Sequence, residues 1–393
     1  MKFFLNETFT FLLLILALTS CQTTSFFNDK SMTSERKSQF EINLRPVLVI
    51  DSLSVPNLFY RKVNLFSPVI YKNNIIVGNS LDGLTSIDKS TKQILWKMKL
   101  KYGVESSGFI ANGSLFFGAL DGFMYSINAE TGTLNWKYDT KAEITASPLV
   151  YNNIVYILNG ANSLFSLDAK SGRQLWVYNR QETTTKMTVR GGSRPTFFNG
   201  IIYTGFSDGS LMAINAQTGT PQWEVILNKN ARFKDIDATP IVDEDNIYIS
   251  SYDDKLYCLS KSNGSIIWKY NFGGATAPII AGNKIFLSTT NGAVVSLNKK
   301  TGDILWAKKN IKGISTELLI LKGLIIFGES QGSLKALDLL TGTEKASFDP
   351  GRGIMSKPST DEAESLYFIS GEANLYQVDI VPVKKSIIPY LVN

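Results

Sequence analysis

The chain has 393 residues, of which 44% are hydrophobic and 11% aromatic, and it carries 40 basic against 34 acidic side chains. This composition excludes an intrinsically disordered chain, and the lack of histidine excludes Ser-His-Asp and Cys-His catalysis and histidine-ligated metals. Two cysteines are too few for thiolate zinc sites or iron–sulfur clusters. The net charge of +6 includes no basic cluster, so no nucleic-acid partner is expected.

The N-terminus has the pattern of a targeting segment. Residues 1–20 carry Lys2 and then an apolar run from Phe9 to Leu18, which is the length of a signal-peptide core and about half that of a membrane-spanning helix. The ending Leu18-Thr19-Ser20-Cys21 resembles the bacterial lipobox, which implies that Cys21 is acylated and becomes the first mature residue. An ordinary signal peptide with an incidental cysteine is the alternative.

A polar, aperiodic stretch follows the lipobox. Residues 21–41 therefore read as the acylated cysteine and a flexible tether, and Gln22 in place of Asp resembles the pattern that sorts lipoproteins to the outer membrane. The second cysteine, Cys258, lies in a strand-like apolar run and is predicted to be a small buried side chain rather than a reactive thiol.

The rest of the chain is built from one repeated unit. Each tryptophan stands four residues after the second residue of a turn, which reads Thr-Gly, Ser-Gly or Asn-Gly in five copies and Thr-Lys in the first. These structural-repeat residues are Trp96, Trp136, Trp176, Trp223, Trp268 and Trp306. A seventh turn, Thr341-Gly342, is followed by Ala346 in place of tryptophan, which predicts a softer seventh unit. With an eighth copy ending at Asp379, the repeat is about 40 residues long.

Short alternating runs separated by Asn-Asn, Asp-Gly and Thr-Gly turns predict four strands in each repeat. Four strands per 40 residues form one propeller blade, so we expect an all-β, eight-bladed β-propeller over residues 42–381. The glycine of the turn supplies a positive φ, and the tryptophan fills the wedge between blades. The run Leu44–Ile50 is predicted to complete blade eight and close the ring, which leaves residues 382–393 as a C-terminal tail.

All length variation falls between the tryptophan position of one repeat and the proline position of the next. Two consecutive connections are long, Val177–Arg194 and Glu224–Thr239, and both are expected on the same face of the disc. Enlarged neighbouring loops on a rigid scaffold indicate a protein-binding site, and neutral drift in loop length is the alternative.

The repeat with its Thr-Gly-x-x-x-Trp signature resembles the PQQ-type eight-bladed propeller superfamily. One branch, the quinoprotein alcohol dehydrogenases, binds pyrroloquinoline quinone and calcium through adjacent cysteines and an acidic cluster. This chain has no adjacent cysteines and is shorter than those enzymes, so we expect no cofactor and no metal. A quinoprotein-like oxidoreductase or a ligand-binding periplasmic propeller is therefore kept as the alternative function.

The order of signal, tether and eight blades is similar to that of the BamB family of outer-membrane lipoproteins, which serve the β-barrel assembly machinery. Met187-Thr188-Val189-Arg190-Gly191 resembles the family segment Leu-x-Leu-Arg-Gly. Residues 232–240 resemble its segment Arg-Leu-x-Asp-Val-Asp-x-Thr-Pro. In that family the two segments dock the POTRA region of BamA, which implicates Met187, Val189, Arg190, Asp235 and Asp237 here.

The resemblance implies a scaffold lipoprotein without catalytic residues, held by its lipid on the periplasmic face of the outer membrane. Its implied partners are BamA, the other subunits of the machinery and unfolded outer-membrane proteins on their way to insertion. Arg190 would provide a charge-assisted contact, the two aspartates complementary charge, and Met187 and Val189 apolar anchors.

Overall fold

The computed structural model describes residues 42–50, 65–180, 192–230, 233–274, 276–361 and 363–382. The signal peptide, Cys21 with the tether, and residues 383–393 lie outside these ranges. Within them all regular structure is strand, and no helix is long and apolar enough to span a membrane. The larger compact unit runs from Asn43 to Val381.

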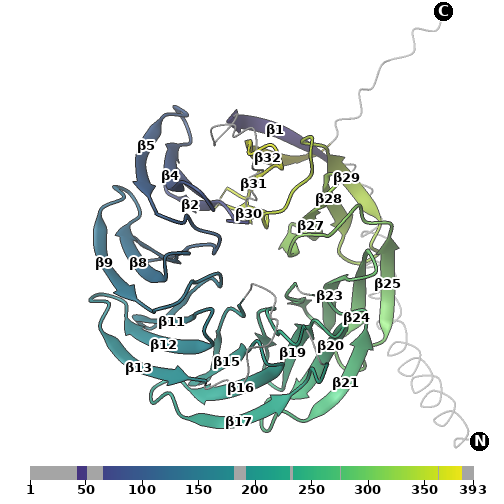
Figure 1. Cartoon of the computed structure of the whole chain (residues 1–393). Coiled ribbons are helices and arrows are strands. Elements are labelled where there is room, and N and C mark those ends of the chain that lie inside the picture. The colour runs from purple at the N-terminus through teal and green to yellow at the C-terminus, as the bar shows by residue number, and fades with distance from the viewer. Residues whose placement is uncertain are drawn as a thin grey trace, which may run out of the picture. The chain divides into compact units, whose positions relative to one another are not determined.

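The strands form eight four-stranded antiparallel sheets arranged in a ring (Figure 1), which confirms the predicted eight-bladed propeller. Blade one contains β2 (Val69–Tyr71), β3 (Asn74–Asn79), β4 (Gly83–Asp88) and β5 (Ile94–Lys99). Blade two contains β6 (Phe109–Ala111), β7 (Ser114–Gly118), β8 (Phe123–Asn128) and β9 (Leu134–Asp139). Blade three contains β10 (Leu149–Tyr151), β11 (Ile154–Leu158), β12 (Ser163–Asp168) and β13 (Gln174–Asn179). Blade four contains β14 (Thr196–Phe198), β15 (Ile201–Gly205), β16 (Ser210–Asn215) and β17 (Pro221–Ile226).

The second half of the chain repeats this arrangement. Blade five contains β18 (Ile241–Val242), β19 (Asn246–Ser251), β20 (Lys255–Ser260) and β21 (Ile266–Asn271). Blade six contains β22 (Ile279–Ala281), β23 (Lys284–Thr289), β24 (Ala293–Asn298) and β25 (Ile304–Lys309). Blade seven contains β26 (Leu319–Leu321), β27 (Leu324–Gly328), β28 (Leu334–Asp338) and β29 (Glu344–Phe348). Blade eight contains β30 (Ser359–Thr360), β31 (Leu366–Ile369), β32 (Leu375–Pro382) and β1 (Ile42–Ile50).

The N-terminal strand closes the ring. As predicted, β1 pairs with β32 as the outer strand of blade eight. Leu44 of β1 is buried, and the Arg45 guanidinium lies 3.9 Å from the Asp379 carboxylate of β32. The interface between blades eight and one is apolar as well, because Ile75 and Val77 pack with Tyr367 and Ile369. Pro382, which the sequence assigned to the tail, is the last residue of β32.

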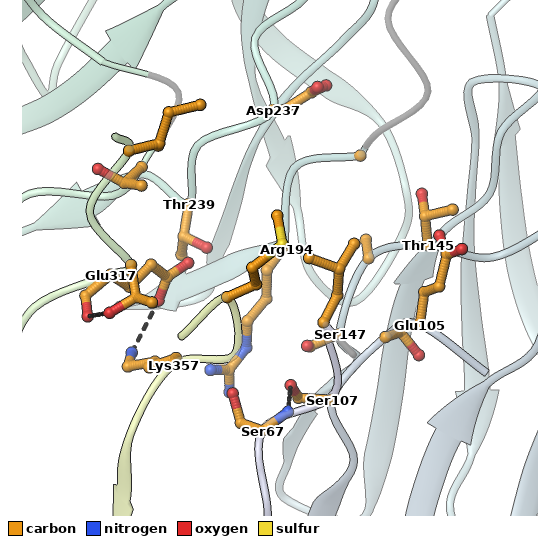
Figure 2. Close-up of a pocket in the computed structure, with 18 of the residues that line it drawn as sticks. Ser67, Glu105, Ser107, Thr145, Ser147, Arg194, Asp237, Thr239, Glu317 and Lys357 are labelled. Carbon is orange, nitrogen blue, oxygen red and sulfur yellow. Dashed lines mark hydrogen bonds and ion pairs between the residues drawn. The ribbon is translucent and has the colours of Figure 1, made fainter. Parts of the chain in front are cut away.

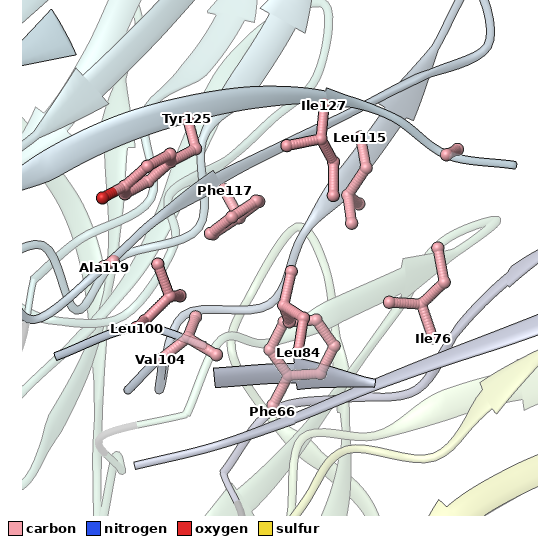
Figure 3. Close-up of a cluster of buried hydrophobic side chains, with 11 residues drawn as sticks. Phe66, Ile76, Leu84, Leu100, Val104, Leu115, Phe117, Ala119, Tyr125 and Ile127 are labelled. Atoms are coloured by element: carbon pink, nitrogen blue, oxygen red, sulfur yellow. The ribbon is translucent and has the colours of Figure 1, made fainter. Parts of the chain in front are cut away.

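The hydrophobic core lies between blades rather than at the centre of the ring. In blades two and three, for example, the middle two strands are buried almost throughout, since both of their faces meet a neighbouring blade. Figure 3 shows one such interface, where Phe66 and Leu84 of blade one pack against Leu115 and Phe117 of blade two. Full burial of a side chain of this size contributes about 1.5–3 kcal/mol. The blades thus depend on their neighbours for stability.

The outer strands carry the tryptophans, and each one contacts the turn of the following blade. A Cβ atom placed on the turn glycine would lie 2.4–2.8 Å from an indole carbon, which real structures do not allow. The pairs are Trp96 with Gly132, Trp136 with Gly172, Trp176 with Gly219, Trp223 with Gly264, Trp268 with Gly302, and Trp306 with Gly342. The Trp136 and Trp176 indoles also donate hydrogen bonds of 2.9 Å to the carbonyl oxygens of Ala169 and Ala216. Each of these tryptophans thus lies at the boundary between its own blade and the next.

The exceptions to this pairing occur together. Blade one has Lys92 at the turn position, with a φ of 63°, and the preceding blade, which ends in β1, has no tryptophan to contact it. Blade seven has Ala346 at the tryptophan position, and blade eight has no Thr-Gly turn because its outer strand comes from the N-terminus. Stacked Phe368 and Tyr376 rings fill this interface and meet Phe348 edge-on. The softer seventh blade stays a prediction.

The glycine–tryptophan contact can be tested with two alanine substitutions. Gly302 and Gly323 have φ values of 78° and 74°, but a Cβ on Gly302 would meet Trp268 at 2.8 Å, whereas one on Gly323 would meet no atom within 4 Å. Both Gly302→Ala and Gly323→Ala incur about 1–2 kcal/mol from the positive φ. Gly302→Ala should cost about 1–3 kcal/mol more, because the new methyl group overpacks the interface. Urea denaturation measures the loss in the free energy of unfolding for each variant. Equal losses would show that the close contact with Trp268 adds no cost.

Candidate functional site

The two long connections contact each other near their starts and again near their ends. Arg180, at the start of the first connection, forms ion pairs of 2.5 Å with Asp208 and with Glu224, where the second connection starts. At the far ends, the Ser193 hydroxyl donates a 2.9 Å hydrogen bond to the Ala238 carbonyl oxygen. These contacts hold the described parts of the two connections side by side, as their positions in consecutive repeats predict.

Of the residues predicted to bind a partner, three lie outside the described residues: Met187, Val189 and Arg190. The other two lie in the second connection, where Asp235 is only 1% exposed and Asp237 lines the central cavity. Burial, and then the nearby Asp235 carboxylate, raise the pKa of Asp237 to about 7. The Asp237 carboxyl is therefore partly protonated near neutral pH, and a partner-binding role for either aspartate stays a prediction.

The fold of the second connection leaves one aromatic side chain outside. Ile236 is fully buried, and its backbone N–H donates to the Phe206 carbonyl oxygen at 3.2 Å. The Asn228 side chain donates to the Phe233 carbonyl oxygen at 3.0 Å, and Phe233 has a φ of 52°. With its backbone fixed in this conformation, the Phe233 side chain remains 48% exposed. An exposed aromatic at a constrained backbone position is suited to anchor a partner.

A cavity of about 510 Å³ lies on the ring axis and is lined by residues from all eight blades. The residue directly before the repeat proline position faces this cavity in seven blades: Ser67, Ser107, Ser147, Arg194, Thr239, Glu317 and Lys357. The eighth equivalent, Ala277, is buried. We call these seven residues the axial ring. Because side chains alternate along an extended chain, the residues two positions earlier, Glu105 and Asp237 among them, form the next layer of the cavity.

The charges of the axial ring are unevenly matched (Figure 2). The Lys357 ammonium of blade eight lies 2.7 Å from the Glu317 carboxylate of blade seven, so these two charges neutralise each other. Arg194 extends from blade four toward the hydroxyls of Ser67 and Ser107. Among the described residues it forms neither a hydrogen bond nor an ion pair, and its guanidinium lies 5.5 Å from the centre of the Phe109 ring. Burial lowers the pKa of Arg194, and the more distant Glu317 raises it.

Neither Phe233 nor Arg194 was singled out by the sequence analysis. For Arg194 a signal existed, since the sequence shows a cation where three of the other seven equivalent positions hold serine.

The burial of Cys258 was predicted correctly. It is a free thiol, fully buried in β20, and burial raises its pKa to about 12. Within the described ranges, no group of three or more acidic, cysteine or histidine side chains is placed to hold a metal ion.

The family of the chain follows from comparison with known proteins. The family model described as outer membrane protein assembly factor BamB matches residues 80–254 and 246–384, which is most of the chain. The chain belongs to the BamB family. The BamB of Legionella pneumophila (strain Paris) is 33% identical over 89 residues, a match that covers 21% of this chain and 23% of that relative.

Solved structures agree on the fold. The crystal structure of BamB from Moraxella catarrhalis has a TM-score of 0.72 and 20% identity, and the match covers 86% of this chain and 99% of that one. Quinohemoprotein alcohol dehydrogenase from Comamonas testosteroni has a TM-score of 0.69 and 14% identity, over 88% of this chain and 77% of the enzyme. At these identities the likeness concerns the fold alone, so BamB proteins and quinoproteins share a scaffold on which different sites are built.

The raised pKa of Asp237 makes stability depend on pH. Between the unfolded value near 4 and the folded value of about 7, the unfolded chain releases the proton that the folded chain keeps, so stability falls as pH rises and then levels off. Asp237→Asn removes this loss and should be about 1–2 kcal/mol more stable than wild type at pH 8, with a smaller difference at pH 5. Urea denaturation at pH 5 and pH 8 measures this difference in the free energy of unfolding. Asp245→Asn, on an exposed turn, is the control. A difference independent of pH would refute this prediction.

Proposed function

We propose that this protein is a non-catalytic scaffold of outer-membrane protein assembly. Family membership supports the assembly role, and the name of the relatives is that of an assembly factor. The matched segment spans about a quarter of the Legionella relative, so partners and mechanism rest on the chain's own residues. In this proposal Cys21 carries the lipid that holds the propeller on the periplasmic face of the outer membrane.

The two long connections are proposed to dock the POTRA region of BamA. The observation that carries this proposal is their attachment to each other at both ends, through Arg180 to Glu224 and Ser193 to Ala238. Loops fixed at their ends lose less conformational freedom on binding, so more of the contact energy appears as affinity. The docked subunit would help deliver unfolded outer-membrane proteins for insertion.

Within this site the residues have different proposed parts. Met187, Val189 and Arg190 would contact BamA directly, with Arg190 as the charge-assisted contact. Phe233 would add an aromatic anchor from the second connection, because nearly half of its surface is exposed. Asp235 is buried, so its contribution would be to hold the second connection in shape. Asp237 lies at the inner end of the connection, beside the central cavity, where its carboxylate would provide complementary charge for the partner.

The docking proposal is tested by a pull-down from detergent extracts with the tagged full chain. Arg190→Glu and Phe233→Ala should each reduce retained BamA about tenfold or more, as expected for anchor residues. Arg173→Glu is the matched control, because Arg173 is exposed directly before β13 (Gln174–Asn179), at the opposite end of that strand from Arg180, and it should retain BamA like wild type. Circular dichroism confirms that each variant is folded.

The outcomes distinguish a wrong docking site from a wrong scaffold function. If wild type retains BamA and the two connection variants do so equally well, BamA is a partner but docks elsewhere. If folded wild type retains none, the scaffold proposal fails. The alternative, a quinoprotein-like oxidoreductase on the same fold as quinohemoprotein alcohol dehydrogenase, is then tested by titration with pyrroloquinoline quinone and calcium.

A further inference from the structure

The central cavity contains a cation, Arg194, that forms no ion pair with any residue that the structure describes. Arg194 occupies the axial ring between Ser147 and Thr239, which belong to the neighbouring blades and offer only hydroxyl groups. The one ion pair of the axial ring, Glu317 with Lys357, is complete without it. Arg194 is only half-buried and faces the open cavity, but its N–H donors have no acceptor among the described residues. A ligand with oxygen atoms would supply such acceptors.

The surroundings of Arg194 are suited to an oxyanion. Its guanidinium presents planar pairs of N–H donors that match a carboxylate or phosphate in two-point contact. The hydroxyls of Ser67, Ser107 and Ser147 lie around it in Figure 2 and can donate to the remaining oxygens. The Ser107 hydroxyl already accepts a 3.0 Å hydrogen bond from the Ser67 backbone N–H, so its own hydrogen is available to a ligand. The volume of about 510 Å³ is that of a small-molecule site.

Three carboxyl groups line the cavity and would oppose an anion. The Glu317 carboxylate of the axial ring is paired with Lys357 at 2.7 Å, and the other two lie one layer away. Glu105 and Asp237 stand two residues before the axial ring in their own blades, which displaces them by about 6–7 Å along an extended backbone. In Figure 2 Asp237 lies at the end of the cavity opposite to Ser67 and Ser107. The carboxyl side chains are thus separated from the hydroxyl cluster that Arg194 reaches.

We propose that the axial ring binds a small oxyanion, with Arg194 as its two-point anchor and the serine hydroxyls of blades one to three as further donors. The site adjoins the docking connections, because Arg194 is the last residue of the first one, but the serine hydroxyls belong to other parts of the chain and lie on the ring axis. Its ligand would be a carboxylate or phosphate small enough to enter the cavity. A ligand bound by four blades at once would also link them and stabilise the ring.

The experiment is calorimetric titration of the folded full chain in detergent with sodium malonate and, separately, inorganic phosphate, at constant ionic strength set by chloride. At least one probe should bind saturably with one site per chain and a Kd below about 1 mM, and the two arms tell a carboxylate site from a phosphate site. Arg194→Gln should weaken binding about tenfold or more, because it removes the anchor. Arg173→Gln, which removes an exposed arginine, should bind like wild type.

A second variant keeps the proposal falsifiable if Arg194→Gln fails to fold. Ser147→Asp leaves Arg194 in place but sets a carboxylate beside it in the axial ring, so it should abolish binding by occupying the guanidinium. The proposal is overturned if neither probe binds wild type. It is also overturned if the Arg194→Gln or Ser147→Asp variant binds as tightly as wild type, which would assign the heat to surface lysines.

Discussion

The contact between the tryptophan of one blade and the turn glycine of the next is the interaction on which the propeller depends. A four-stranded blade has two apolar faces and no core of its own, so it must be held at a fixed angle to its neighbours. The indole fills the outer part of the wedge between two blades, and the turn can approach it only where a hydrogen replaces Cβ. Six interfaces repeat this solution with the same pair of residues.

The two interfaces without the pair show that it is needed only where a turn meets an outer strand from the preceding blade. Blade eight takes its outer strand from the N-terminus, so it offers neither a turn to blade seven nor a tryptophan to blade one. Aromatic rings fill the first gap, and the apolar cluster around Ile75 and Tyr367 fills the second. Lys92, with its positive φ, can stand at the turn position in place of glycine because no indole packs there. The irregularities of the repeat are thus consequences of ring closure.

A ring held together at its periphery leaves the axis and the connecting loops free to vary. The inner strands are short, and the axial-ring side chains before them face the cavity, outside the apolar clusters between blades. The connections after the outer strands tolerate insertions for the same reason. Both proposed sites use this freedom: one in the two enlarged connections, the other in side chains of the axial ring.

The sequence by itself determined the fold, because the signals that specify a blade are local. The turn residues, the tryptophan four positions later and the alternating apolar runs all lie within one repeat, and counting them gave eight blades and the closing N-terminal strand. It also identified Cys258 as a buried side chain, since an apolar run around a cysteine is itself a local pattern.

Only the tertiary structure decided which side chains of the site face solvent, core or axis. Asp235 and Asp237 are two residues apart in one loop, but one is buried and the other reaches the cavity, where burial raises the pKa of its carboxyl. The exposure of Phe233 depends on a backbone conformation fixed by Asn228. Among the described residues Arg194 forms no ion pair, because Ser147 and Thr239 beside it on the axis carry hydroxyls and Glu317 is paired with Lys357. Solvation and charge pairing depend on distances between distant residues, which no pattern within one repeat encodes.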